Sequence, residues 1–326
     1  MSSVKLFRSL LCTMLAWAAA NNNGSAFQEW VSNFDVDPPV NSGIVPMALN
    51  AQASYTVYGS TSDEGETPIL WVHGLPVNST SWYPQLEYFQ HKTQNIVVDL
   101  AGCGSTSQVP AGVNITDFDI DVCLAVLDHL NVSQAIVVGF ASGGHPVLRL
   151  AARHPDRVLK FVVINSSPRF RTTGDPDWPW GFNDTVIAKF QHLIDTEDVA
   201  SVVRTLLIPA LKDPCPDETT FLQQVIVDMA ENSGIYPVRE FWHDMCFDDD
   251  VALMSNITSP ALFITSSQST VVPFDVAYKL RTLVNGTSAV VEVSAADHFV
   301  FMTQAPIVNH ILDQFMAPQC HLYNHP

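Results

Sequence analysis

The stretch of sequence that decides the fold is Val137-Val138-Gly139-Phe140-Ala141-Ser142-Gly143-Gly144-His145-Pro146-Val147-Leu148. A short apolar run, residues 135–138, leads into it and has the character of a buried strand. Apolar residues after the turn recur at helical spacing. Glycine lets a strand and a helix approach closely, and it stands at 139, 143 and 144. The stretch therefore predicts a strand, a tight turn that holds its central side chain at the edge of a sheet, and a helix.

The rest of the chain alternates strands with helices. Strands are predicted at 53–59, 68–72, 96–98, 158–164, 261–265 and 289–293, and helices at 82–89, 115–130, 274–283 and 307–315. This order indicates an α/β fold with a mostly parallel, doubly wound sheet that is covered on both faces. Right-handed crossovers then place the carboxyl ends of the strands, and a site, along one edge.

The alternation breaks over residues 168–256, where prolines punctuate short helical pieces. We interpret this region as a helical lid inserted after the core strand that ends near Asn165. The chain, 326 residues long, is sufficient for one large domain with such an insertion. The predicted division is a signal peptide over 1–20, a surface leader over 21–52, core over 53–167, lid over 168–256, core over 257–315 and a tail over 316–326.

The N-terminus has the pattern of an export signal. Lys5 and Arg8 precede an apolar run over 10–17, and alanines at 18–20 suit a cleavage site. An uncleaved anchor is the alternative, although the run is short for a bilayer span. We expect a secreted glycoprotein, since N-x-[ST] sequons are dense. The expected acceptors are Asn23, Asn78, Asn114, Asn131, Asn183, Asn256 and Asn285.

The cysteines and the net charge indicate which disulfide, cofactors and partners to expect. Cys215 and Cys246 both fall in the lid region and are the expected disulfide, with buried free thiols as the alternative. No C-x-x-C occurs, so neither zinc nor a redox dithiol is indicated. We expect no metal and no cofactor. A net charge of −18 disfavours nucleic acid and anionic membranes. The expected partner is a small-molecule substrate or ligand, without stable membrane insertion, and the protein is expected to be a monomer or homodimer.

Five landmarks in order give the chain a resemblance to a known superfamily. They are His73-Gly74, Asp99-x-x-Gly102-x-Gly104, the turn Gly139 to Gly144, the run Ala152 to Val158, and Asp297-His298-Phe299 followed by Gln304-Ala305-Pro306. With these, residues 53 to 315 resemble the α/β-hydrolase superfamily, in its lidded, secreted esterase- or lactonase-like branch. The resemblance implies a nucleophile, a base and an acid in contact, and backbone N–H groups aimed at an oxyanion.

The resemblance assigns these roles residue by residue. It makes His298 the catalytic base and gives the oxyanion hole the N–H groups of Leu75 and Ser142. The nucleophile position carries Ala141, whose methyl group cannot attack a substrate. Ser142 could serve as nucleophile only in an elbow shifted by one residue.

The acid is also replaced. The two usual acid positions hold Ser269 and Asn165, and either side chain could orient His298 by a neutral hydrogen bond. His73 is expected to bond loop backbone, and His145 to lie beside the site. Two of the three triad positions are therefore altered together.

Three functions follow. The first is an enzyme that acts on a small apolar or aromatic molecule, with His298 as general acid/base and a backbone oxyanion hole but no covalent intermediate. The second is a conventional ester or lactone hydrolase that uses Ser142 in a shifted elbow. The third is a non-catalytic member of the fold that binds a small ligand.

Overall fold

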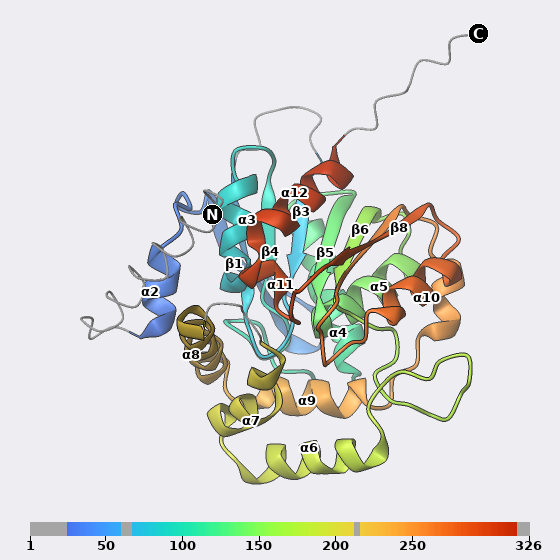
Figure 1. Cartoon of the computed structure of the whole chain (residues 1–326). Helices are drawn as coiled ribbons and strands as arrows, with labels where there is room; N and C mark the ends of the chain where they lie inside the picture. The colour runs from blue at the N-terminus through green and yellow to red at the C-terminus, as the bar shows by residue number, and fades with distance from the viewer. Residues whose placement is uncertain (1–24, 60–66, 212–215, 318–326) are drawn as a thin grey trace, which may run out of the picture.

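The computed structural model describes residues 25–59, 67–211 and 216–317. Its centre is a sheet with the strand order β1-β2-β4-β3-β5-β6-β7-β8 (Figure 1). The strands β1 and β2 pair antiparallel to their neighbours, and all pairs from β4 to β8 are parallel. The predicted mostly parallel sheet is confirmed. The bounds are β1 (Asn41–Pro46), β2 (Gln52–Tyr58), β3 (Ile69–Val72), β4 (Asn95–Val98), β5 (Ala135–Phe140), β6 (Val158–Ile164), β7 (Ala261–Ser266) and β8 (Ser288–Val293).

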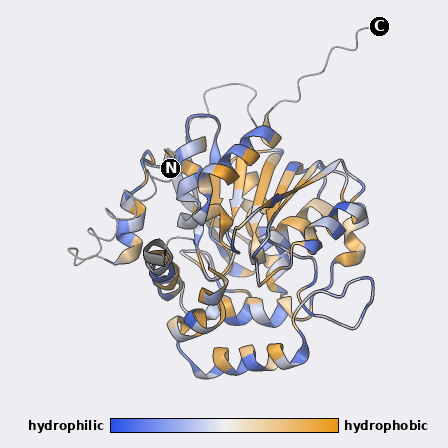
Figure 2. Cartoon of the chain, in the orientation of Figure 1, coloured by the Kyte–Doolittle hydropathy of each residue, from blue (hydrophilic) through white to orange (hydrophobic). Residues whose placement is uncertain are grey.

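Helices cover both faces of this sheet because its strands are apolar on both sides. In β3, Ile69 and Trp71 pack with one core, whereas Leu70 and Val72 pack with the other, as the two-residue period of a strand requires. The central strands are accordingly apolar along their length (Figure 2). The first core is closed by α3 (Tyr83–Phe89), α11 (Val300–Thr303) and α12 (Ala305–Met316), and the second by α4 (Ile115–His129), α5 (Gly144–Arg153) and α10 (Asp275–Leu283).

A helical insertion, residues 168–256, separates β6 from β7 where the sequence predicts the lid. Its α-helices are α6 (Asp184–Thr196), α7 (Val199–Leu206), α8 (Pro216–Ser233) and α9 (Ile235–Met245). In Figure 1, α6, α7 and α9 lie together along one edge of the sheet. The helix α9 packs against α4 of the core, and α6 packs against α9. The insertion therefore forms a second layer over that edge, and its action as a lid stays a prediction.

The prediction of a surface leader up to residue 52 is wrong in part. Residues 41–46 form β1, which pairs with β2, so the sheet begins earlier than the predicted residue 53. Ahead of it, α2 (Ala26–Ser32) packs against α8, buries Trp30, and donates from the Phe27 N–H to Asp228. The strand was missed because Gly43 and Pro46 interrupt a short run with little apolar character.

Some of the predicted secretory features lie in the described part of the chain, and others do not. The predicted signal peptide and Asn23 lie outside the described residues. Four other predicted acceptors are exposed, namely Asn131, Asn183, Asn256 and Asn285, whereas Asn78 and Asn114 are half-buried. Asn114 also donates its amide hydrogens to Asp248 and accepts from Arg149. Glycosylation stays a prediction, and in the described part of the chain no helix has the length and apolar character to cross a bilayer.

The predicted disulfide is not formed. Cys246 is a free, buried thiol at the end of α9, and burial raises its pKa to about 12. Its predicted partner, Cys215, lies outside the described residues. The alternative of buried free thiols describes Cys246, and Cys103 and Cys123 are buried and free as well.

One carboxyl group is buried in the core without a cation. Asp119 of α4 accepts a hydrogen bond from the Ala101 N–H at 2.9 Å, and its Oδ2 has no hydrogen-bond partner among the described residues. Burial raises the pKa of Asp119 to about 7 because the charged form loses its hydration. The folded state therefore holds this proton more tightly than the unfolded state does, and stability falls as the pH rises from about 4 through 7.

The variant Asp119→Asn tests this loss of stability at higher pH. We expect the free energy of unfolding of the variant to rise relative to that of the wild type as the pH rises from 4 to 8, by on the order of a few kcal/mol at pH 8, since the amide is never charged. Denaturant unfolding at each pH measures this difference. Glu197→Gln, at an exposed carboxylate, is the matched control and should show no such trend. Parallel curves for Asp119→Asn and wild type across this range would contradict the assignment.

Candidate active site

The elbow between β5 and α5 keeps the predicted register. Ala141 lies at its apex with φ 47°, in the left-handed region that an ordinary side chain rarely adopts. The flanking glycines are required by close packing: a Cβ on Gly143 would lie 1.9 Å from the carbonyl oxygen of His73, and one on Gly139 would lie 2.7 Å from Val147. Because Ala141 itself holds the left-handed apex and the Ser142 hydroxyl turns to the Leu75 N–H, the shifted elbow that would present Ser142 is not formed.

Ser142 lies beside the apex and makes a different contact from the one expected of a nucleophile. Its Oγ accepts a hydrogen bond from the backbone N–H of Leu75 at 2.6 Å. Within the described ranges no hydrogen bond joins Ser142 to His298. The Leu75 N–H, which the sequence assigns to the oxyanion hole, is thus already donated to a hydroxyl of the protein itself.

His298 follows β8 and precedes α11, as predicted. Its Nδ1 lies 3.1 Å from the Oγ of Ser269, which is the side chain that hydrogen-bonds to the imidazole among the described residues. Burial lowers the pKa of His298 to about 3, because the charged form of the ring loses its hydration. Its Nε2 has no hydrogen-bond partner in the described part of the chain. His298 is therefore a neutral imidazole with one free nitrogen.

Asn165 does not orient the imidazole. Its amide nitrogen donates to the backbone oxygen of His298 and to Ser266 Oγ, both at 2.8 Å, and its Oδ1 accepts from the Ser266 N–H. Asn165 also has a left-handed backbone, with φ 49°. It therefore fixes the loop that carries His298, whereas Ser269 contacts the ring.

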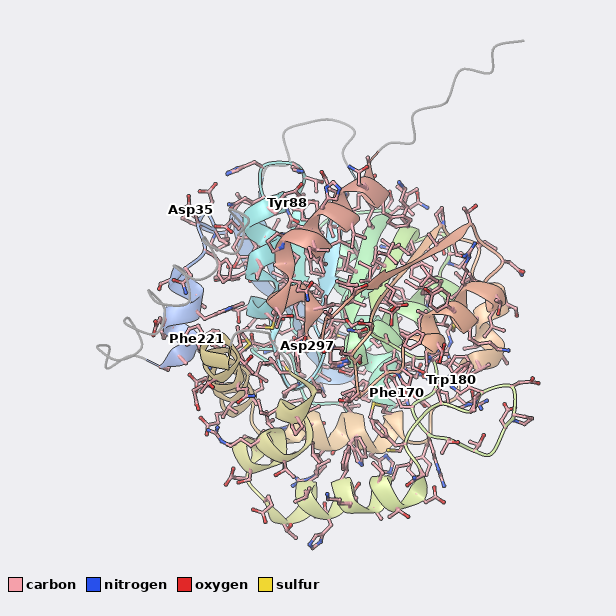
Figure 3. All side chains as sticks on the ribbon, viewed as in Figure 1. Asp35, Tyr88, Phe170, Trp180, Phe221 and Asp297 are labelled. Atoms are coloured by element: carbon pink, nitrogen blue, oxygen red, sulfur yellow. The ribbon has the colours of Figure 1, made fainter. Side chains whose placement is uncertain are left out.

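A cavity of about 150 Å³ opens beside these residues. Its polar lining consists of Ser142, Thr270 and His298, and Ala141 adds the methyl group at the apex. Aromatic side chains form much of the remaining wall, and all of them come from the helical insertion. Figure 3 labels Phe170, where the insertion begins, and Asp297, the neighbour of His298, on the side of the sheet that faces the insertion. The aromatic lining residues are Phe170, Phe182, Phe190, Phe241 and Trp242.

Two other histidines have structural contacts. His73 donates from Nδ1 to the Gly74 carbonyl and accepts at Nε2 from the Leu100 N–H, each at 3.1 Å, which is the loop bonding predicted for it. His145 packs on Phe170 and places Nε2 2.8 Å from Asp250 at the end of the insertion. Neither ring lines the cavity.

Asp250 belongs to a buried charge network that we did not predict from the sequence. Arg149 of the elbow helix α5 donates to Asp250 at 2.6 Å and also pairs with Asp248 and Asp117. Burial opposes the charge of Asp250, but bonds from His145 and Arg149 outweigh it and hold the pKa of its carboxyl below the ordinary value. The network joins α5 to the end of the insertion. An arginine inside the apolar repeat of a helix and an acidic run at 248–250 are the signals that could have predicted it.

Comparison with known proteins identifies the family. The family model described as "alpha/beta hydrolase fold" matches residues 67–305. The chain belongs to the α/β-hydrolase fold family. The match spans the sheet from β3 through β8, the elbow and His298. Among described residues no group of His, Cys, Asp and Glu side chains is placed to hold a metal ion.

Curated relatives include hydrolases of several kinds. A putative carbamate hydrolase, RutD, of a Caulobacter species is 30% identical over 142 residues, which cover 42% of this chain and 52% of that relative. The pimeloyl-[acyl-carrier protein] methyl ester esterase of Vibrio cholerae is 26% identical over 76% of this chain and 93% of its own length. These relatives share the scaffold over different spans.

Solved structures share the fold. The enol-lactonase of Burkholderia xenovorans superposes with a TM-score of 0.74 at 17% identity, covering 85% of this chain and 99% of its own. A bromoperoxidase of Bacillus anthracis gives a TM-score of 0.74 at 19% identity over 85% of this chain and 99% of its own. At such identities the likeness concerns the fold alone.

The positions of Ala141 and Ser269 predict a gain of function. In Ala141→Ser/Ser269→Asp the apex acquires a hydroxyl and His298 acquires a carboxylate at Nδ1. We expect hydrolysis of 4-nitrophenyl acetate to rise by roughly 10²-fold or more over wild type, since triad members act together. The triple variant that also carries His298→Ala should return to the wild-type rate. A correctly folded double variant with unchanged turnover and no labelling by an organophosphate would refute the placement.

Proposed function

We propose that this protein acts on a small, apolar or aromatic carbonyl compound, with His298 as general acid/base and without a covalent intermediate. The observation that supports it most directly is that three residues line the same cavity: Ala141 with its methyl group, Ser142 with its hydroxyl, and His298 with no hydrogen-bond partner at Nε2 among the described residues. The relatives named for methyl ester, carbamate and enol-lactone chemistry act on carbonyl compounds too. Secretion through the segment 1–20 is part of the proposal.

The proton step needs only these groups. With Nδ1–H donating to Ser269 Oγ, the Nε2 lone pair accepts a proton from the carbon next to the carbonyl. The C–H electron pair becomes the carbon–carbon double bond of an enolate, and the carbonyl π pair moves to oxygen. A hydrogen-bond donor at the elbow stabilises that oxygen. Return of the proton to another atom gives isomerisation, and loss of a neighbouring group gives elimination.

A non-catalytic ligand-binding protein is the second candidate. It is favoured by the pKa of about 3 for His298, since a base that weak removes a proton slowly. It is also favoured by the Leu75 N–H, which already has a partner. The two candidates share the cavity and differ only in whether a proton moves.

Deuterium exchange separates them. We expect the wild-type protein to exchange the methyl hydrogens of acetophenone in D₂O, followed by ¹H NMR, and His298→Gln to lose at least about 10²-fold of that rate. Glutamine keeps a polar side chain but offers no basic nitrogen. Binding of acetophenone without exchange in the wild type would favour the non-catalytic candidate. Exchange that persists in His298→Gln would remove His298 as the base.

The pH profile gives an independent test of the base. Because burial lowers the pKa of His298 to about 3, its neutral form dominates at every higher pH, and we expect the exchange rate to show no acidic limb from pH 5 to 8. In Ser269→Asp the new carboxylate favours the imidazolium, so the limb should move up into this range. An inflection near pH 6.5 in the wild type would contradict the buried, unpaired state of the ring.

A further inference from the structure

We propose that the Ser142 hydroxyl has taken over ligand recognition from the Leu75 N–H, and that the ligand it selects is an uncharged carbonyl compound built on a single aromatic ring. This inference rests on the proposed function, because it names the substrate class of the same cavity. It assigns Ser142 a role as a hydrogen-bond donor to the ligand, which is distinct from attack on a substrate.

The Ser142 hydroxyl accepts one hydrogen bond and still has its own hydrogen to donate. Its Oγ accepts from the Leu75 N–H at 2.6 Å, and its own hydroxyl hydrogen reaches no acceptor among the described residues. Ser142 is only 7% exposed and lines the cavity. A hydroxyl that accepts a hydrogen bond becomes a better donor, since linked bonds polarise one another. A ligand oxygen in the cavity would therefore receive the Ser142 hydrogen in place of the Leu75 hydrogen.

The apex of the elbow makes space for that oxygen. The Ala141 side chain is a methyl group that lines the cavity next to Ser142. A hydroxyl at the apex would compete for the ligand oxygen or for Nε2 of His298. The ligand oxygen is thus held about 2.7 Å from Ser142 Oγ, one hydrogen bond farther from the Leu75 backbone than direct binding would place it.

The cavity favours a neutral ligand. Its described lining contains no lysine or arginine, and the single titratable side chain in that lining is His298, which is uncharged. A carboxylate moved from water into such surroundings loses its hydration without gaining a cation. The protein as a whole carries −18, which also repels anions. Ketones, aldehydes, esters and lactones provide the acceptor oxygen without the charge.

The aromatic walls and the volume of the cavity favour a ligand with a single aromatic ring. Phe170, Phe190 and Trp242 contribute aromatic surfaces, and Phe190 and Trp242 lie 4.8 Å apart between ring centres. Aromatic groups pack favourably against one another at such separations. An apolar cavity of about 150 Å³ is large enough to take up benzene, and the present cavity has about that volume.

Three matched probes test the inference: acetophenone, ethylbenzene, which lacks the carbonyl, and benzoate, which is charged. We expect the wild type to bind acetophenone about tenfold or more tightly than ethylbenzene by calorimetry, and to bind benzoate more weakly than either. Ser142→Ala should abolish the preference for acetophenone over ethylbenzene, and Ser142→Thr, which keeps a hydroxyl, should retain it. Ser166→Ala is the control, because that buried hydroxyl donates to the Ala141 carbonyl of the same turn and does not line the cavity.

The outcomes separate this inference from the proposed function. A preference for acetophenone that survives Ser142→Ala, equal binding of acetophenone and ethylbenzene in the wild type, tighter binding of benzoate, or no binding of any probe would each overturn it. Deuterium exchange that depends on His298 would still support the proposed function in the first three cases. Conversely, a preference that depends on Ser142 without exchange would support the inference for a non-catalytic binder.

Discussion

The rest of the structure depends on the contact between the elbow and the end of β3. Gly143 lies so close to the His73 carbonyl that no side chain fits there, and the residue two places before it, Ala141, has a left-handed backbone. The constraint acts on glycines and backbone, and it is indifferent to the side chain at the apex. A chain can therefore replace the apex serine with alanine and keep its sheet, its helix α5 and the loop that carries His298.

Burial then decides which groups carry charge. Asp250 and Asp119 are both buried carboxyls, but Asp250 lies between Arg149 and His145 and has a lowered pKa, whereas Asp119 has one N–H and a raised pKa. His298 resembles Asp119 in this respect, because loss of hydration on burial is what shifts its pKa. The charged network lies between α5 and the end of the insertion, and the candidate site is left neutral.

Much of this arrangement was accessible from sequence because its signals are local. Continuous apolar runs place the strands from β2 onward within a residue or two, and the resemblance to the α/β-hydrolase superfamily assigns Ser269 to the acid position, where it does contact the ring of His298. What the sequence could not supply depends on side-chain direction across long separations. Asn165 turns to the backbone of the His298 loop, and Ser142 meets Leu75 across 67 residues. The strand β1 has a weak apolar pattern of its own and is defined by its pairing with β2.

The contact between Ser142 and Leu75 connects these points. A backbone N–H that is partly withdrawn from water needs an acceptor, and the Ser142 hydroxyl supplies one for Leu75. A second hydroxyl, on Ser269, stands at the imidazole where a carboxylate would raise its pKa. A neutral hydroxyl thus stands at two positions of the site, Ser142 at the Leu75 N–H and Ser269 at the imidazole. Hydrolysis by a triad would need an open N–H donor at the first position and a charged carboxylate at the second. Such a site favours ligands that exchange hydrogen bonds with it. It disfavours ligands that develop a full negative charge, because its donors are already partly satisfied and its base is uncharged.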